Sequence, residues 1–178
     1  GEYSINHYLA LKHKFSKDIS LTAVLRPDQK IGKVDKDTKK FTQGDSYLKL
    51  GLPVFYKSKK GSKIYSQLRY YAPLSESSKK KEIKGKVSPR IYATTSAGDF
   101  DLTYLLIPTI YINKKSEVGQ KEFSQGHWLQ VSFSATEKLT VDLAAYPSWS
   151  YSKNEKSEFN DIPIYPGLSY AFMSKLSL

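Results

Sequence analysis

Residues 139–151 read Leu-Thr-Val-Asp-Leu-Ala-Ala-Tyr-Pro-Ser-Trp-Ser-Tyr, with an apolar side chain at every second position. Leu139, Leu143 and Trp149 fall on one face, whereas Asp142 and Ser148 fall on the other. This alternation predicts a β-strand with one apolar and one polar side. Because the strand spans about a dozen residues and ends in aromatic residues, it suits a tilted crossing of a lipid bilayer better than a soluble sandwich.

The same alternation recurs along the whole chain, whereas no segment shows a convincing helical period. It predicts nine strands, at residues 3–15, 19–26, 48–54, 64–72, 87–94, 100–112, 128–135, 139–151 and 164–172. Short turns alternate with long polar loops, which cover residues 28–44, 73–85, 113–124 and 152–161. Barrels of the outer membrane have this arrangement. We therefore expect an all-β fold, an antiparallel up-and-down transmembrane β-barrel of about eight to ten strands, with residues 1–178 as one domain.

The expected number of strands is odd, whereas single-chain bacterial barrels have even numbers. With the long loops outside, the first and the last strand would both descend towards the periplasm. Ten strands result if one strand precedes those in this chain, and eight result if one of the nine does not cross the membrane. We favour ten strands, so that the chain lacks one strand at its N-terminal side.

Composition leaves both a soluble and a membrane protein open. The chain has no cysteine, 39% hydrophobic residues and a mean hydropathy of −0.50, and a transmembrane barrel has such values because half of each strand faces a polar interior. It has no apolar run of about 18 residues, so we expect no transmembrane helix. Much of the net charge of +11 comes from lysine-rich runs, which are either solvated loops or surfaces that attract lipid phosphates or acidic glycans.

Several prolines lie inside the predicted strands. The pattern Pro-x-apolar-Tyr begins at Pro53, Pro89 and Pro108, and looser versions begin at Pro147 and Pro166. Proline cannot donate an amide hydrogen bond, so in a sheet it belongs at an edge or a bulge. In a barrel we expect the strands to bulge or loosen at these points near one rim. Alternatively, the prolines mark strand ends, which would shorten the strands and favour a soluble fold.

The final predicted strand contains Tyr-Pro-Gly-Leu-Ser-Tyr-Ala-Phe at residues 165–172. It resembles the C-terminal assembly signal of bacterial outer-membrane proteins, with Gly167, Tyr170 and Phe172 at the key places. The chain departs from that signal because it continues to Leu178 instead of ending on an aromatic residue. The resemblance implies a monomer in the bacterial outer membrane, with membrane lipid, lipopolysaccharide and the outer-membrane assembly machinery as its partners.

If the apolar faces point to lipid, the polar faces line the interior. The predicted lining residues are Lys12, Arg26, Lys49, Arg69, Arg90, Asp101, Asp142, Tyr92 and Tyr146, together with Lys175 near the C-terminal end. The predicted lipid-facing residues are Leu50, Leu106, Val131, Phe133, Leu143 and Trp149. In one interpretation the arginines pair with the aspartates and plug the interior. In the other, a narrow wet passage with a basic excess favours anions or sugar acids.

The sequence contains few signs of catalysis. His7, His13 and His127 lack the spacing of metal ligands, so we expect neither a metal nor another cofactor. Small barrels that deacylate lipid A carry a serine two residues after the histidine, but Leu129 occupies that place after His127. No phosphate-binding loop or serine elbow is present. We therefore expect a protein that is not an enzyme, and the long apolar faces argue against a nucleic-acid partner.

A soluble, lipocalin-like barrel that binds an apolar ligand is the main alternative. In that protein Leu50, Leu106, Phe133 and Leu143 would line the cavity, and the arginines would lie outside in water. The two hypotheses therefore differ in which face of the sheet is inside.

Overall fold

The computed structural model describes residues 2–32, 41–115, 117–173 and 176–177. Lys175 and part of the first long loop lie outside these residues. The elements are β1 (Glu2–Asn6), β2 (Leu9–Lys14), β3 (Ser20–Leu25), β4 (Pro27–Gly32), β5 (Phe41–Gln43), β6 (Tyr47–Lys57), β7 (Lys63–Tyr71), α1 (Glu76–Lys80), β8 (Ile83–Ala97), β9 (Phe100–Asn113), β10 (Lys121–Ser134), β11 (Leu139–Ala145), β12 (Ser148–Ser152), β13 (Glu158–Phe159), β14 (Ile164–Met173) and β15 (Leu176–Ser177).

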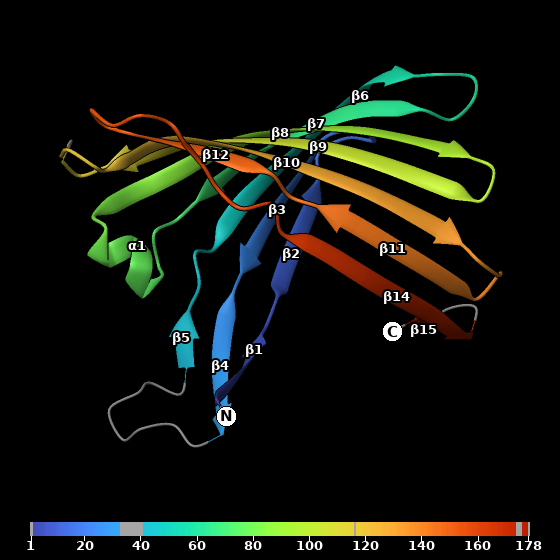
Figure 1. The fold of residues 1–178 in the computed structure, drawn as a ribbon, viewed down its shortest axis with the longest axis horizontal. Helices are drawn as coiled ribbons and strands as arrows, with labels where there is room; N and C mark the ends of the chain where they lie inside the picture. Colours follow the sequence, from blue (N-terminus) through green and yellow to red (C-terminus); the bar gives the residue numbers. More distant parts are fainter. Residues whose placement is uncertain (1, 33–40, 116, 174–175, 178) are drawn as a thin grey trace.

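The main sheet is an antiparallel meander, which confirms the predicted all-β, up-and-down topology. Its order is β2-β3-β6-β7-β8-β9-β10-β11-β14-β15, so successive long strands are neighbours in space. The turns that join β6 to β7, β8 to β9 and β10 to β11 lie at one end of the molecule, whereas α1 lies at the other (Figure 1). Short connections therefore gather at one end of the sheet, as the loop lengths predicted.

The predicted strand boundaries needed three changes. The first hairpin is interrupted, and β1, β4 and β5 form a separate three-stranded sheet beyond the break. The stretch at residues 139–151 is also two strands, β11 and β12, and both pair with β10. In contrast, β8, β9 and β10 have 15, 14 and 14 residues, because polar residues assigned to loops continue their ladders.

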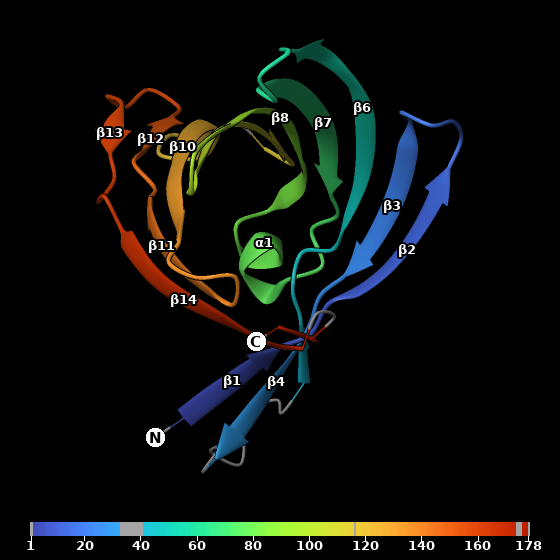
Figure 2. The same ribbon diagram turned by 90° about the vertical axis from the view of Figure 1, so that its right-hand side faces the viewer.

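The sheet is not closed, and this corrects the expectation of a complete barrel. Within the described residues no pairing joins β2 to β14, and these strands form the two sides of the opening in the curled sheet (Figure 2). From β2 to β14 the order contains nine strands. In an antiparallel meander the first and ninth strands run in the same direction, so they cannot complete an antiparallel ladder. Beyond β14 the order continues with the two-residue β15, which pairs antiparallel with it.

The register places the two sets of side chains on opposite faces of the sheet. Lys12 lies opposite Thr22, Thr22 opposite Lys49, and Lys49 opposite Arg69. The same face continues through Lys86 and Tyr111, which share a pocket with α1. Because α1 lies inside the curl (Figure 2), this polar face is concave, and the apolar face is convex.

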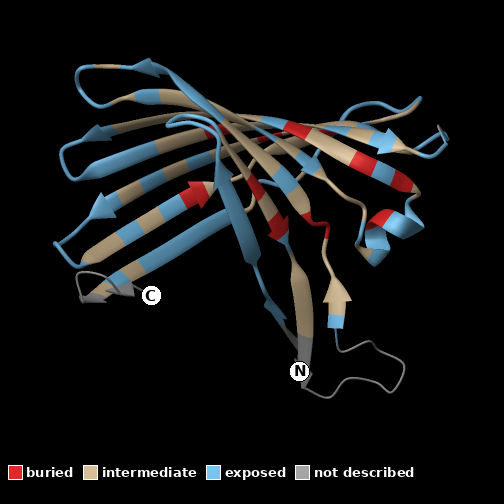
Figure 3. Ribbon diagram, turned by 180° about the vertical axis from the view of Figure 1, so that it is seen from behind, coloured by how far each residue is buried: buried red, intermediate tan, exposed pale blue. Residues whose placement is uncertain are grey.

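The convex face exposes large apolar side chains on most of the long strands. Leu11 is 78% exposed, Leu168 70% and Leu143 55%. Buried positions are scattered and few (Figure 3), and the buried apolar residues are Val24, Ile83, Leu105 and Ala144 among those described. The sheet therefore has no conventional hydrophobic core on either side.

The prolines lie where the ladders loosen. The register between β6 and β7 shifts between Gly51 and Val54, which brackets Pro53. Between β8 and β9 the pairing reaches Val87–Ile110 and resumes at Ile91–Leu106, so Pro89 and Pro108 fall in the gap. Pro147 lies in the break between β11 and β12. The ladders loosen at these three sites, as predicted, but Pro89 and Pro108 lie in the middle of β8 and β9 and not near one rim. Pro166 remains paired opposite Leu143.

The short helix α1 was not predicted from the sequence. Ser75 is its N-cap and accepts a hydrogen bond from the amide of Ser78, while Glu76 lies in the first turn and Lys79 in the last. These are ordinary helix signals. The helix has only five residues, so it is too short to show an apolar period.

Candidate functional site

A row of cations crosses the concave face on adjacent strands. Lys12 of β2, Lys49 of β6 and Arg69 of β7 belong to one row of the register, with Thr22 of β3 between the two lysines. Ser88 continues the row on β8. The alternation that put these residues on one predicted face therefore also brings them together in space.

These cations line a pocket of about 530 Å³ at the end of the sheet that carries the β2–β3 turn. We call it the basic pocket. Its residues include Lys12, Lys49, Arg69, Tyr65, Gln67 and Tyr92, and Lys14, Lys17 and Asp18 contribute from the turn end. The described lining therefore has a clear excess of positive charge.

Hydrogen bonds and ring contacts order the side chains in the basic pocket. The Arg69 guanidinium lies 4.9 Å from the ring centre of Tyr47, and its Nε donates to Gln67 Oε1 at 3.4 Å. Tyr65 and Tyr92 are stacked, with ring centres 4.7 Å apart and an angle of 2° between the planes. Gln67 Nε2 donates to the hydroxyl of Tyr92. The pocket thus combines cations with a flat aromatic surface.

The predicted aspartates do not neutralise these cations. Asp142 accepts hydrogen bonds from Ser132 Oγ and Gln130 Nε2, and Asp101 accepts one from Ser96 Oγ. Arg69 and Arg90 have no carboxylate within 4.0 Å among the residues that the structure describes. The expected pairing of the arginines with the aspartates is therefore wrong. The aspartates lie nearer the short turns, on rows of the register that contain neither arginine, and they accept hydrogen bonds from serine and glutamine instead.

Tyrosine fills the concave face next to the basic pocket. Arg90 Nη2 donates to the hydroxyl of Tyr71 at 2.9 Å, and Arg69 Nη1 approaches the same oxygen at 3.5 Å. The ring of Tyr146 lies directly over Gly126, where a Cβ would come within 2.6 Å of the tyrosine Cζ. We call Tyr71, Arg90 and Tyr146 the tyrosine constriction.

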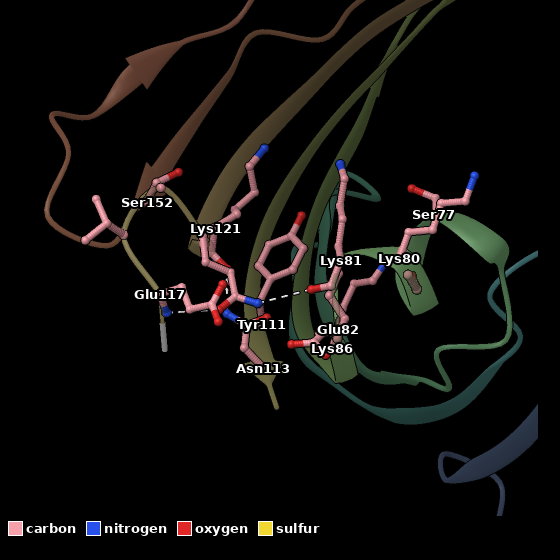
Figure 4. Close-up of a pocket in the computed structure, with 15 residues that line it drawn as sticks. Ser77, Lys80, Lys81, Glu82, Lys86, Tyr111, Asn113, Glu117, Lys121 and Ser152 are labelled. Carbon is pink, nitrogen blue, oxygen red and sulfur yellow. Dashed lines mark hydrogen bonds between the residues drawn. The ribbon is translucent and has the colours of Figure 1, made fainter. Parts of the chain in front are cut away.

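A second pocket of about 620 Å³ lies at the end of the sheet that carries α1. We call it the rim pocket, and Figure 4 shows Lys81, Lys86, Tyr111 and Lys121 around it. Gln120 Nε2 donates to the carbonyl of Lys81 at 3.1 Å, which ties the loop after β9 to the end of α1. The concave face therefore has the rim pocket at one end and the basic pocket at the other. Within the tyrosine constriction, Tyr71 lies opposite Lys86 of the rim pocket and Arg90 lies opposite Gln67 of the basic pocket.

Asp45 anchors α1 beside the rim pocket. It accepts from Lys86 Nζ at 2.6 Å, Ser78 Oγ at 2.5 Å and the Ser75 amide at 2.9 Å. Burial alone would raise the pKa of Asp45, but the hydrogen bonds from Lys86, Ser78 and Ser75 outweigh it and lower the pKa from 3.8 to about 2. Asp45 is therefore charged at neutral pH and holds the helix against β8.

The remaining predicted residues divide between the two faces. Tyr92 lies in the basic pocket, whereas Arg26 lies at the end of β3, with its guanidinium 5.3 Å from the ring centre of Tyr8. All six residues expected to face lipid are on the convex face by register: Leu50, Leu106, Val131, Phe133, Leu143 and Trp149. Among them, Val131 and Phe133 are 40% and 37% exposed.

His127 lies in the middle of β10, on the convex face, and not beside a loop as its sequence context suggested. Its Nδ1 is 2.7 Å from the Tyr104 hydroxyl, and its Nε2 is 2.9 Å from Gln125 Nε2. Its ring packs edge-on against Trp149. Neither a serine nor a carboxylate hydrogen-bonds to this ring among the described residues, and no cluster there could hold a metal ion.

Sequence reasoning missed Tyr71 and Gln67 as site residues, as well as the pairing of Asp45 with Lys86. The alternation places Tyr71 on the same face as Arg69, but nothing in the pattern indicates that its hydroxyl accepts from two arginines. Asp45 has the composition of a turn residue, and its role depends on α1, which lies about 30 residues further along the chain. Only spatial contacts could identify these residues.

No protein-family model matches this chain, and no curated protein matches it either. Within the described residues, no helix is both long and apolar enough to span a membrane.

Proposed function

We propose that this chain is an integral protein of the bacterial outer membrane whose concave face lines a narrow passage for small anionic solutes. The observation that carries the proposal is that the apolar face of the sheet is outside and the charged face is inside. Leu143 and its apolar neighbours are exposed on the convex face, whereas Arg69 and Arg90 are partly buried on the concave face. A soluble barrel would have the opposite arrangement.

The apolar convex face supports membrane insertion. Soluble monomers rarely expose a continuous apolar surface of more than a few hundred Å², but here exposed leucine, isoleucine, valine and phenylalanine recur from β2 to β14. Strands of about ten residues suffice to cross a bilayer when tilted. The strands β8, β9 and β10 exceed this length, so their ends would reach the lipid headgroups.

Aromatic pairs lie near both ends of the convex face. Phe100 and Phe133, beside the short turns, have ring centres 4.9 Å apart. At the other end, Trp149 packs against Phe159 at 5.1 Å. Aromatic residues favour the two boundaries between hydrocarbon and water in membrane barrels. The apolar surface between the pairs would therefore face the hydrocarbon, with the lysine-rich long loops near the phosphates of lipopolysaccharide.

The cations on the concave face support a preference for anions. Arg69 and Arg90 lie on the neighbouring strands β7 and β8 and have no carboxylate within 4.0 Å among the described residues, whereas Lys86 is paired with Asp45. Rings or rows of arginine and lysine are the usual lining of anion-selective pores. A cylinder closed by antiparallel pairing alone would need one further long strand between β2 and β14, in line with the expected ten strands.

Extraction is the first test of membrane insertion. We expect the chain to require detergent, because water would otherwise contact the whole convex face. A chain that remains soluble and monodisperse without detergent would remove the membrane proposal in favour of a soluble barrel.

Planar-bilayer conductance then tests the passage. In a salt gradient we expect a reversal potential that indicates anion preference, and Arg69→Ala should weaken that preference. Arg90→Ala should weaken it too and also raise the current, because it opens the tyrosine constriction. The matched control is the double substitution of Lys59→Ala and Lys60→Ala in the exposed β6–β7 turn. Absence of current from every form would leave a purely structural role.

A further inference from the structure

The basic pocket offers a ligand more than positive charge. The stacked Tyr65 and Tyr92 give it a flat apolar surface, and the side chains of Gln67 and Arg69 lie beside them. The face of an aromatic ring packs against the apolar C–H face of a sugar ring. Polar side chains beside the aromatic ring can then form hydrogen bonds with the sugar hydroxyls. A simple inorganic anion would not use this surface.

The cations in the pocket are left without opposite charges. Lys12, Lys49 and Arg69 have no carboxylate partner within 4.0 Å among the described residues, although they repel one another. Lys14 and Lys17 add further positive charge at the turn end of the pocket, where Asp18 is the carboxylate in the described lining. A cluster of like charges without partners is favourable only when opposite charge comes from outside, so these cations indicate a site for an anionic ligand.

The spacing of the cations suits a chain of charged rings. Neighbouring strands are about 4.8 Å apart, so Lys49 and Arg69 are separated by one strand spacing and Lys12 lies two spacings from Lys49. One strand spacing is close to the length of one sugar ring. The pocket of about 530 Å³ falls within the usual range of sites for organic ligands, and it is far larger than a single phosphate requires.

We propose that the basic pocket binds a short carboxylated saccharide, with its carboxylates on Lys12, Lys49 and Arg69 and one sugar ring against the tyrosine pair. This inference rests on the proposed anion passage, because it names the class of solute that the passage would select. In this proposal Tyr65 and Tyr92 contact the sugar ring, whereas a site that selected by charge alone would not need them.

Calorimetric titration of the full chain in detergent tests this site without relying on current. The probes are cellotriuronate, the neutral cellotriose of the same backbone, and inorganic phosphate. We expect cellotriuronate to bind at least about tenfold more tightly than either of the others, because only it satisfies both the cations and the aromatic surface. Equal affinity for phosphate and cellotriuronate would overturn the proposal, as would equal affinity for cellotriose.

Two sets of variants locate the binding. The double substitution of Lys49→Gln and Arg69→Gln should weaken cellotriuronate binding by about tenfold or more, and Tyr92→Leu should weaken it while leaving phosphate binding unchanged. Lys59→Gln with Lys60→Gln in the β6–β7 turn removes the same charge outside the pocket and should change nothing. Unchanged circular dichroism and unfolding midpoint identify variants that are folded.

The two proposals can fail separately. Binding of cellotriuronate without any bilayer current would retain the saccharide site and remove the passage. Anion current without selective cellotriuronate binding would retain the passage and remove the saccharide site.

Discussion

Gly126 and Tyr146 form one packing unit on the concave face. A Cβ at Gly126 would lie 2.6 Å from Cζ and 2.7 Å from Cε2 of the Tyr146 ring, so any side chain there would displace a rigid ring. We expect Gly126→Ala to lower the free energy of unfolding by about 1 to 3 kcal/mol, as overpacking does elsewhere. Urea unfolding in detergent micelles measures the change.

Tyr146→Ala provides the control for this packing. In that background the space over Gly126 is open, so Gly126→Ala should then cost much less. If the substitution costs the same with and without the tyrosine ring, the loss comes from the backbone and not from the contact. The Tyr146 ring would then be packed less tightly against Gly126 than the short distances indicate.

Asp45 makes the anchoring of α1 dependent on pH. Its pKa is about 2 in the folded protein against an ordinary value of 3.8, so the charged form is favoured by folding. A lowered pKa contributes stability above the unfolded pKa and loses it as the pH falls through the folded pKa. The contribution of about 2 kcal/mol should therefore be present at pH 7, decline below about pH 4 and vanish below about pH 2.

Asp45→Asn tests this dependence. At pH 7 we expect faster hydrogen exchange of the α1 amides and a loss of about 2 kcal/mol in the stability of the anchored helix. At about pH 2 the variant and the natural chain should converge. A difference that stays constant over this pH range would show that the shape of the side chain matters and its charge does not.

Among the elements, the pair β8 and β9 combines the longest strands with two prolines. Ser88 is fully buried, and its Oγ donates to the Pro108 carbonyl at 2.7 Å, inside the gap in the ladder. Thr109 Oγ1 donates to the same hydroxyl at 3.3 Å. A side chain thus supplies a hydrogen bond where proline cannot donate one.

We expect Ser88→Ala to destabilise the sheet by about 1 to 3 kcal/mol, because a buried carbonyl loses its donor. The unfolding midpoint in urea measures this loss. Ser134→Ala, at the exposed end of β10, is the matched control and should change stability by less than about 0.5 kcal/mol. If both variants behave alike, the gap in the ladder is satisfied in some other way.

Period-two alternation predicted the long strands because each has one apolar face, and the register kept Lys12, Lys49 and Arg69 in one row. It did not predict β4, β5 or α1, because polar segments pair through their backbones and a helix of five residues has no period. Nor could it place Asp101 and Asp142. The partners of these two aspartates depend on how far along its strand each one lies. The alternation predicts only which face of the sheet a side chain is on.

The whole molecule depends on which solvent meets each face. Leu11 and Leu168 are among the most exposed residues, and they lie on the two outermost long strands. In water these side chains would favour aggregation, whereas in a bilayer they would be solvated by lipid tails. The bilayer also makes the open edges costly, because unpaired backbone groups in hydrocarbon lack any partner.

A second copy of the chain in the same orientation cannot extend the antiparallel ladder at those edges. Copies inserted with the same orientation present β2 and β14 in the same direction, so pairing between the two edges would be parallel and would not complete the antiparallel ladder. Copies related by a two-fold axis in the membrane plane would place the loops of one copy on the wrong side. An all-antiparallel closure therefore requires one strand that runs against both edges.

Hydrogen exchange of the chain in detergent tests this topology. Alternate amides of β2, and of β14 before its short pairing with β15, point away from a single neighbour, so we expect them to exchange far faster than the amides of β8 and β9, which have neighbours on both sides. Their exchange should not depend on protein concentration, because a second copy cannot pair with both edges. Protection of β2 and β14 equal to that of β9 would mean that the edges are covered, and protection that rises with concentration would contradict the orientation argument.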